Sequence, residues 1–147
     1  MKGQVLCCLA WCILLCLSIP ALAEPQEASS PVIIVSPRQT PAPISKNALR
    51  AMFGMRLRNW PDQTPVHVFV LRDDNPTHSL FSKQILNIYP HQLRLAWDRL
   101  VFSGTGQAPT EVSSEEEMRE QVAKTPGAIG YLPRSMINGS VRILPVQ

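Results

Sequence analysis

Residues 68–81 read VFVLRDDNPTHSLF, and this stretch decides the fold class. Its first part completes a run from Val66 to Leu71 that is apolar except for His67, which is typical of a strand covered by helices on both faces. A short polar turn follows, in which Asp74 or Asn75 can cap a helix that has Pro76 in its first turn. A buried strand that leads through a short turn into a helix is the unit from which α/β domains are built.

The segments on either side continue this alternation. Apolar, β-branched runs predict strands, and apolar residues at helical spacing between caps and stop signals predict helices. Further strands are expected at residues 31–37, 128–132 and 141–146, and further helices at 46–54, 90–102 and within 113–124. Residues 103–112 are expected to form a loop. The sequence therefore predicts an α/β domain with a mostly parallel or mixed sheet flanked by helices.

The beginning of the chain resembles a secretory signal. Lys2 precedes an apolar run from Val5 to Leu17, and Ala21-Leu22-Ala23 has small residues at the positions that a signal peptidase reads. The apolar run is shorter than the roughly 20 residues that span a membrane. We expect residues 1–23 to be a signal peptide cleaved after Ala23. A lipoprotein modified at Cys16 and an uncleaved membrane anchor are the alternatives.

Cleavage after Ala23 would determine the length, cysteine content and net charge of the exported chain. Residues 24–30 would form a flexible lead-in and residues 31–147 one domain, which is a length suited to a single core. All four cysteines lie within residues 1–23, so neither disulfides nor cysteine-based zinc sites are expected. The remaining charge of +2 is too small to favour nucleic acid or an anionic membrane surface. No second long apolar run follows, so membrane insertion of the exported chain is not expected.

Other polar and aromatic residues have structural interpretations. The three histidines lack metal-ligand spacing, so no metal and no cofactor is expected. Acidic side chains favour the first turn of a helix, so residues 115–117, Glu-Glu-Glu, are interpreted as a solvated helix start with Ser114 as the cap. Trp97 lies on an apolar helical stripe and is expected in the core. The other members of this stripe are Leu93, Leu100 and Val101.

Several short motifs occur in a distinctive order. Phe53-Gly54 precedes Trp60-Pro61, then follow Phe102-Ser103-Gly104 and the run from Pro126 to Tyr131. In this order and spacing the chain resembles short exported proteins related to phosphate-transporter substrate-binding proteins, which have the type 2 periplasmic-binding fold. The resemblance implies a single lobe of that fold, because full-length members have two lobes that close around an oxyanion.

The resemblance also implies a site. In the larger relatives an arginine and a Ser-Gly-Thr turn at a helix start bind the anion, and the matching turn here is Asn75-Pro76-Thr77, with Arg72 one residue closer to it. An oxyanion site would therefore comprise Arg72, Asn75, Thr77 and Ser79, since charged and hydroxyl donors suit such a ligand. In the alternative interpretation, Arg72 pairs with a neighbouring aspartate and the polar turn only satisfies the helix start.

Catalysis has little support in the sequence. There is no G-x-S-x-G elbow and no phosphate-cradling glycine-rich loop, so an enzyme is not expected. The resemblance favours a periplasmic or secreted solute-binding protein that takes phosphate or a similar oxyanion and works with a membrane transporter. The alternative is an envelope protein–protein interaction module that keeps the fold without the anion site.

Overall fold

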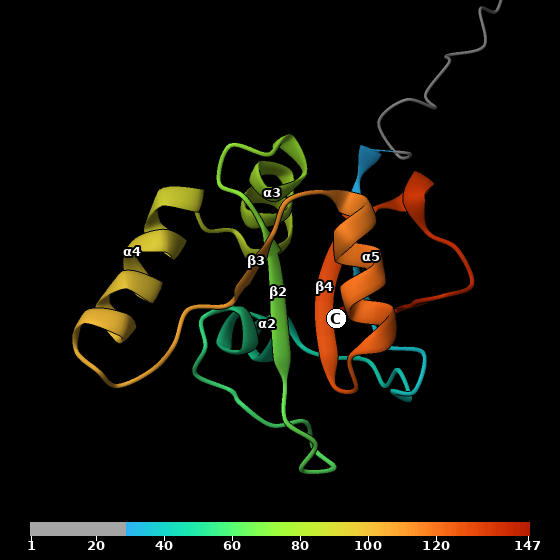
Figure 1. Cartoon of the computed structure of the whole chain (residues 1–147), viewed down its shortest axis with the longest axis horizontal. Coiled ribbons are helices and arrows are strands. Elements are labelled where there is room, and N and C mark those ends of the chain that lie inside the picture. The colour runs from blue at the N-terminus through green and yellow to red at the C-terminus, as the bar shows by residue number, and fades with distance from the viewer. Residues whose placement is uncertain (1–28) are drawn as a thin grey trace, which may run out of the picture.

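A computed structural model describes residues 29–147, which form a mixed sheet flanked by helices (Figure 1). The strands are β1 (Pro31–Val35), β2 (His67–Leu71), β3 (Thr110–Val112), β4 (Ala128–Pro133) and β5 (Arg142–Ile143). The helices are α2 (Lys46–Phe53), α3 (Pro76–Leu80), α4 (Pro90–Phe102) and α5 (Glu115–Lys124), with the π-helical η1 (Phe81–Leu86) and the 3-10 turn η2 (Arg134–Met136). The predicted α/β class and mixed sheet are confirmed. The predicted signal peptide and most of the lead-in lie outside the described residues.

The strand order of the sheet is β3-β2-β4-β1-β5. The strands β2, β3 and β4 run parallel, and β1 is antiparallel to both of its neighbours. Because the chain adds β3 on one side of β2 and then β4 on the other, the order reverses at β2. Ligands of open α/β sheets bind at the carboxyl ends of strands beside such a reversal. The loop that leaves β2 is residues 72–75, which we call the β2–α3 loop.

Helices cover both faces of the sheet. In β4 successive residues point to opposite faces, and Gly130 faces α5 so closely that a Cβ there would lie 2.5 Å from Met118 Sδ. Tyr131 faces the other side, where its ring stacks on Phe81 at 3.8 Å between centroids and lies 6.0 Å from Phe53. In Figure 1, α5 lies in front of the sheet, and α2 and α3 lie behind it.

Three helix caps are as predicted. Ser45 Oγ accepts a hydrogen bond from the Ala48 N–H, and Asn75 Oδ1 accepts from the N–H groups that open α3. Ser114 Oγ accepts from the Glu117 N–H at 3.1 Å. These caps satisfy donors that a helix start otherwise leaves unpaired.

Only part of the apolar stripe predicted on α4 is buried. Trp97 is fully buried, and its indole N–H donates to the Phe53 carbonyl at 2.8 Å, so its predicted core position is confirmed. Leu93 is also buried. The prediction for Val101 is wrong, because that residue is 48% exposed and Phe102 beside it is 88% exposed. The helix thus meets the rest of the domain along a narrow seam near Leu93 and Trp97.

The prediction of a loop at residues 103–112 is also wrong at its end. Thr110–Val112 form β3, which pairs in parallel with Phe69–Leu71 at the edge of the sheet. This strand carries the chain to α5 beside the end of β2. Among residues 29–147, no helix combines the length and apolar character needed to cross a bilayer.

Candidate functional site

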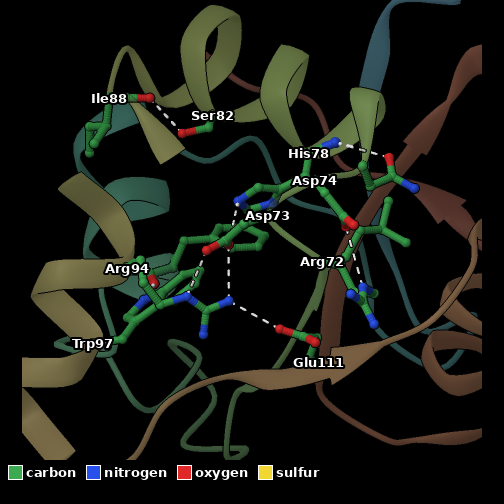
Figure 2. Close-up of polar contacts among 12 residues, drawn as sticks. Arg72, Asp73, Asp74, His78, Ser82, Ile88, Arg94, Trp97 and Glu111 are labelled. Carbon is green, nitrogen blue, oxygen red and sulfur yellow. Dashed lines mark hydrogen bonds and ion pairs between the residues drawn. The ribbon is translucent and has the colours of Figure 1, made fainter. Parts of the chain in front are cut away.

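The β2–α3 loop begins with Arg72, whose side chain is 61% exposed. Its Nε lies 3.3 Å from Asp74 Oδ1, and the Asp74 side chain is 75% exposed (Figure 2). This is the aspartate pairing that the sequence left open as the alternative. An ion pair so exposed to water contributes at most about 1 kcal/mol. The contact therefore holds Arg72 only weakly.

Asn75 and Thr77 lie at the start of α3 and converge on one acceptor. Asn75 uses its Oδ1 to accept from the Thr77 N–H at 2.7 Å, which leaves its amide hydrogens for other contacts. Asn75 Nδ2 donates to Glu115 Oε1 at 3.2 Å, and Thr77 Oγ1 donates to the same oxygen at 2.8 Å. We call Asn75 Nδ2 and Thr77 Oγ1 the donor pair. The structure thus brings two of the four predicted site residues together around a carboxylate oxygen.

Ser79 lies farther along α3 than the donor pair. It is half-buried, and its backbone N–H donates to the Asn75 carbonyl at 3.1 Å. Within the described part of the chain, the Ser79 hydroxyl is not among the donors to the Glu115 carboxylate. Arg72 and Ser79 therefore lie on either side of the donor pair in the sequence, and among the described contacts neither shares its acceptor.

Glu115 is the site residue that the sequence interpretation missed. It opens α5 and is half-buried, whereas Glu116 beside it is exposed as a solvated helix start should be. Burial opposes ionisation of the Glu115 carboxyl, but the hydrogen bonds from Thr77 and Asn75 outweigh it and hold the pKa below its ordinary value. Glu115 is consequently a carboxylate at neutral pH. Recognising β3 would have identified it, because parallel neighbouring strands place the starts of α3 and α5 at one edge of the sheet.

A buried histidine supports the loop from beneath. The His78 side chain is fully buried, with Nδ1 in a short hydrogen bond to the Tyr131 hydroxyl. That hydroxyl accepts from the Leu71 N–H at 2.9 Å, and Nδ1 is its other hydrogen-bond partner among the described residues, so the arrangement that also satisfies the hydroxyl proton has Nδ1 as its acceptor. The imidazole proton is then on Nε2, which faces Asp73 Oδ1 at 3.6 Å. Burial lowers the pKa of His78 and raises that of Tyr131, so both groups are neutral at pH 7.

Asp73 also anchors the β2–α3 loop to α4 and β3. Arg94 Nε and Nη2 each lie 2.9 Å from an oxygen of Asp73, and Nη2 also lies 3.0 Å from Glu111 Oε2 (Figure 2). The Arg94 hydrogen bonds hold the pKa of Asp73 below its ordinary value despite partial burial. A bidentate contact of this kind fixes orientation as well as distance. The loop is therefore held at Asp73, while Arg72 before it stays exposed.

Three solved structures share this fold with the chain. A phosphate transport receptor from Vibrio cholerae aligns with a TM-score of 0.63 at 12% identity, over 80% of this chain and 46% of its own. A putative phosphate ABC transporter substrate-binding protein from Clostridium perfringens, solved with bound phosphate, gives 0.64 at 16% identity, over 80% and 44%. PstS from Borrelia burgdorferi gives 0.59 at 20% identity, over 80% and 47%.

These likenesses establish the fold, and the chain spans less than half the length of each of these three proteins. No curated protein matches the sequence. The family model described as PBP superfamily domain matches residues 27–140, which is most of the chain. The protein therefore belongs to the PBP superfamily domain family.

Proposed function

We propose that this protein is a noncatalytic, solute-binding-type protein that takes phosphate or a similar oxyanion at Arg72, Asn75, Thr77 and Ser79. The observation that carries the proposal is the donor pair, whose two members already donate to one carboxylate oxygen. A phosphate oxygen is the same kind of acceptor as a carboxylate oxygen. The donor pair lies at the carboxyl end of β2, beside the reversal of strand order where such sheets bind ligands.

Arg72 supplies the positive charge in this proposal. Its contact with Asp74 is exposed and at 3.3 Å, so an anion bound at the donor pair would compete with it at small cost. Arg94 is less suitable, because Asp73 and Glu111 already bind its guanidinium. Of these two arginines, Arg72 is the one available to an anion.

The proposed role is capture rather than catalysis. The solved structures of the same fold are named as transport receptors and substrate-binding proteins. By analogy we place the exported chain in the periplasm or outside the cell and give it a membrane transporter as partner. The signal peptide at residues 1–23 belongs to this proposal.

Calorimetry of the exported protein tests the proposal. We expect wild type to bind phosphate, and Arg72→Ala to bind it about ten- to a hundredfold more weakly, because a charged hydrogen bond contributes roughly 1.5–3 kcal/mol. Arg99→Ala is the matched control, since Arg99 is exposed on α4 and its loss changes the net charge equally. Equal binding by Arg72→Ala and Arg99→Ala would place the site elsewhere.

The second candidate function is an interaction module of the cell envelope. It is favoured because Glu115 already accepts from the donor pair. Asp74 likewise already forms an ion pair with Arg72. Under this alternative the same surface would contact a protein. Sulfate and phosphate at millimolar concentration would then give no heat of binding with wild type or with any variant described below.

A further inference from the structure

We propose that Glu115 is a built-in competitor that occupies the oxyanion position, so that a ligand enters only when the Glu115 side chain leaves. The inference rests on the proposed function and adds a residue that controls access to the same site. Its basis is that one oxygen, Glu115 Oε1, accepts from both members of the donor pair, at 3.2 Å from Asn75 Nδ2 and 2.8 Å from Thr77 Oγ1. The Thr77 hydroxyl has a single hydrogen, so it cannot serve a second anion while that contact persists, and Asn75 Nδ2 keeps only one further hydrogen to donate.

The fold places Glu115 at this position. The strands β2 and β3 are parallel neighbours, with Leu71 opposite Val112, so the chain leaves both strands at the same edge of the sheet. The β2–α3 loop and the first turn of α5 therefore begin side by side. Glu115 is the first residue of α5, and its side chain reaches the donor pair across the gap between the two helix starts.

Charge makes the competition stronger than a shared hydrogen bond alone. The lowered pKa keeps Glu115 ionised at neutral pH, so an anion at the donor pair would lie beside a like charge. An entering oxyanion must then replace the hydrogen bonds of Glu115 and also overcome this repulsion. Removal of the carboxylate should therefore increase affinity rather than reduce it.

Glu115 can leave without disturbing the helix that carries it. The cap of α5 is Ser114, whose Oγ accepts from the Glu117 N–H at 3.1 Å, and Glu117 in turn accepts from Ser113. Glu115 takes no part in these contacts. A change of its side-chain rotamer would vacate the donor pair while the backbone stays in place, so substitutions of Glu115 should leave the fold intact.

Titration of the exported wild type, Glu115→Ala and Glu115→Gln with inorganic phosphate and sulfate, at fixed pH and ionic strength, tests the inference. We expect Glu115→Ala to bind phosphate at least about tenfold more tightly than wild type. Glu115→Gln should gain less, because an amide oxygen can still accept from the donor pair while carrying no charge. Circular dichroism and the melting temperature of each variant verify that it is folded.

Matched controls separate a local effect from a change of net charge. Glu116→Ala removes the same charge from the same turn at an exposed position, and its affinity should stay within about twofold of wild type. In the double variant Thr77→Val with Glu115→Ala, the increase in phosphate affinity should be lost, because one member of the donor pair is absent.

The possible outcomes distinguish the two proposals. Equal phosphate binding by wild type and Glu115→Ala would overturn the proposal that Glu115 is a competitor, while leaving the proposed oxyanion function standing. An equal gain in Glu115→Ala and Glu116→Ala would also overturn it, because net charge alone would explain the result. If no variant binds either anion at millimolar concentration, both the competitor and the oxyanion function are wrong.

Discussion

At the scale of single residues, the supports of the β2–α3 loop are chemically coupled from the core to the surface. Tyr131 and His78 are buried, Asp73 is half exposed, and Arg94 ties Asp73 to Glu111. Burial keeps Tyr131 and His78 neutral at pH 7, and the hydrogen bonds from Arg94 keep Asp73 ionised. Because burial keeps the His78 imidazole neutral, its protonation at acidic pH should destabilise the loop.

His78 should make the protein less stable as the pH falls from about 7 to 5. Burial lowers its folded-state pKa below the ordinary value near 6.5, although the charge of Asp73 opposes the shift. Between those two values the unfolded chain binds more protons than the folded one, so stability is full above about pH 6.5 and decreases as the pH falls. Melting temperatures of wild type and His78→Gln across this range measure the effect.

The variant His78→Gln has a side chain that does not titrate, so its melting temperature should vary less with pH than that of wild type. His91→Gln, at an exposed position on α4, is the matched control and should keep the wild-type dependence. An unchanged slope in His78→Gln would assign the acid sensitivity to other groups.

Sequence patterns predicted the turn that carries the candidate site, but not all of the contacts made there. The family resemblance placed the oxyanion site on Arg72, Asn75, Thr77 and Ser79, and its assignment to them stays a prediction. The polar turn between a strand and a helix that carries them is where the structure has it. The partner Glu115 is separated from Thr77 by 38 positions, and local periodicity says nothing about contacts at that distance. His78 was equally hidden, because a histidine in a helix has the same local pattern whether buried or exposed.

At the scale of elements, the predictions succeeded where a segment carries its own signals. The strands β1, β2 and β4 are apolar runs, and the three helix caps are side chains next to the donors that they satisfy. The strand β3 was not predicted, because it has only three residues, Thr110–Val112, of which only Val112 is buried. A short edge strand of this kind has neither alternation nor an apolar run. Without β3, the sequence analysis could not predict that α5 begins beside α3.

The turn between α5 and β4 depends on Gly127. This residue has φ +72, and a Cβ there would overlap the Pro65 carbonyl oxygen. Its own carbonyl accepts from the Trp60 indole N–H at 2.9 Å and from the His67 N–H at 3.1 Å. The Trp-Pro segment and the Pro-Gly turn, both noted in the sequence, therefore meet in space. Close backbone contact leaves no room for a side chain.

Gly127→Ala should therefore lose much more stability than Gly104→Ala in urea unfolding. Gly104 has φ +68, and no atom lies within 4 Å of the place that a Cβ would take, so its substitution costs only the left-handed conformation, roughly 1–2 kcal/mol. Gly127→Ala adds the clash with Pro65 to that same cost. Similar losses in the two variants would show that the turn shifts to accommodate a methyl group.

At the scale of the whole molecule, the proposed location depends on the amino-terminal residues. Export is a proposal from the sequence of residues 1–23, which lie outside the described residues. We expect the exported form to begin at Glu24, because small residues at alternating positions before it suit a signal peptidase. Mass spectrometry of the exported fraction measures the mass directly. An intact Met1, or an acyl group on Cys16, would contradict this expectation.

The position of β1 in the sheet affects the order in which the chain folds. This strand is synthesised early, yet it pairs with β4 and β5, which lie about a hundred residues later in the sequence. The bridge between Ile44 and Val146 adds a further contact of the same range. Contacts of such long sequence separation slow folding. A chain emerging from the ribosome thus keeps the apolar β1 unpaired until β4 and β5 have been made, and an unfolded chain is the form that a narrow channel would thread in the proposed export.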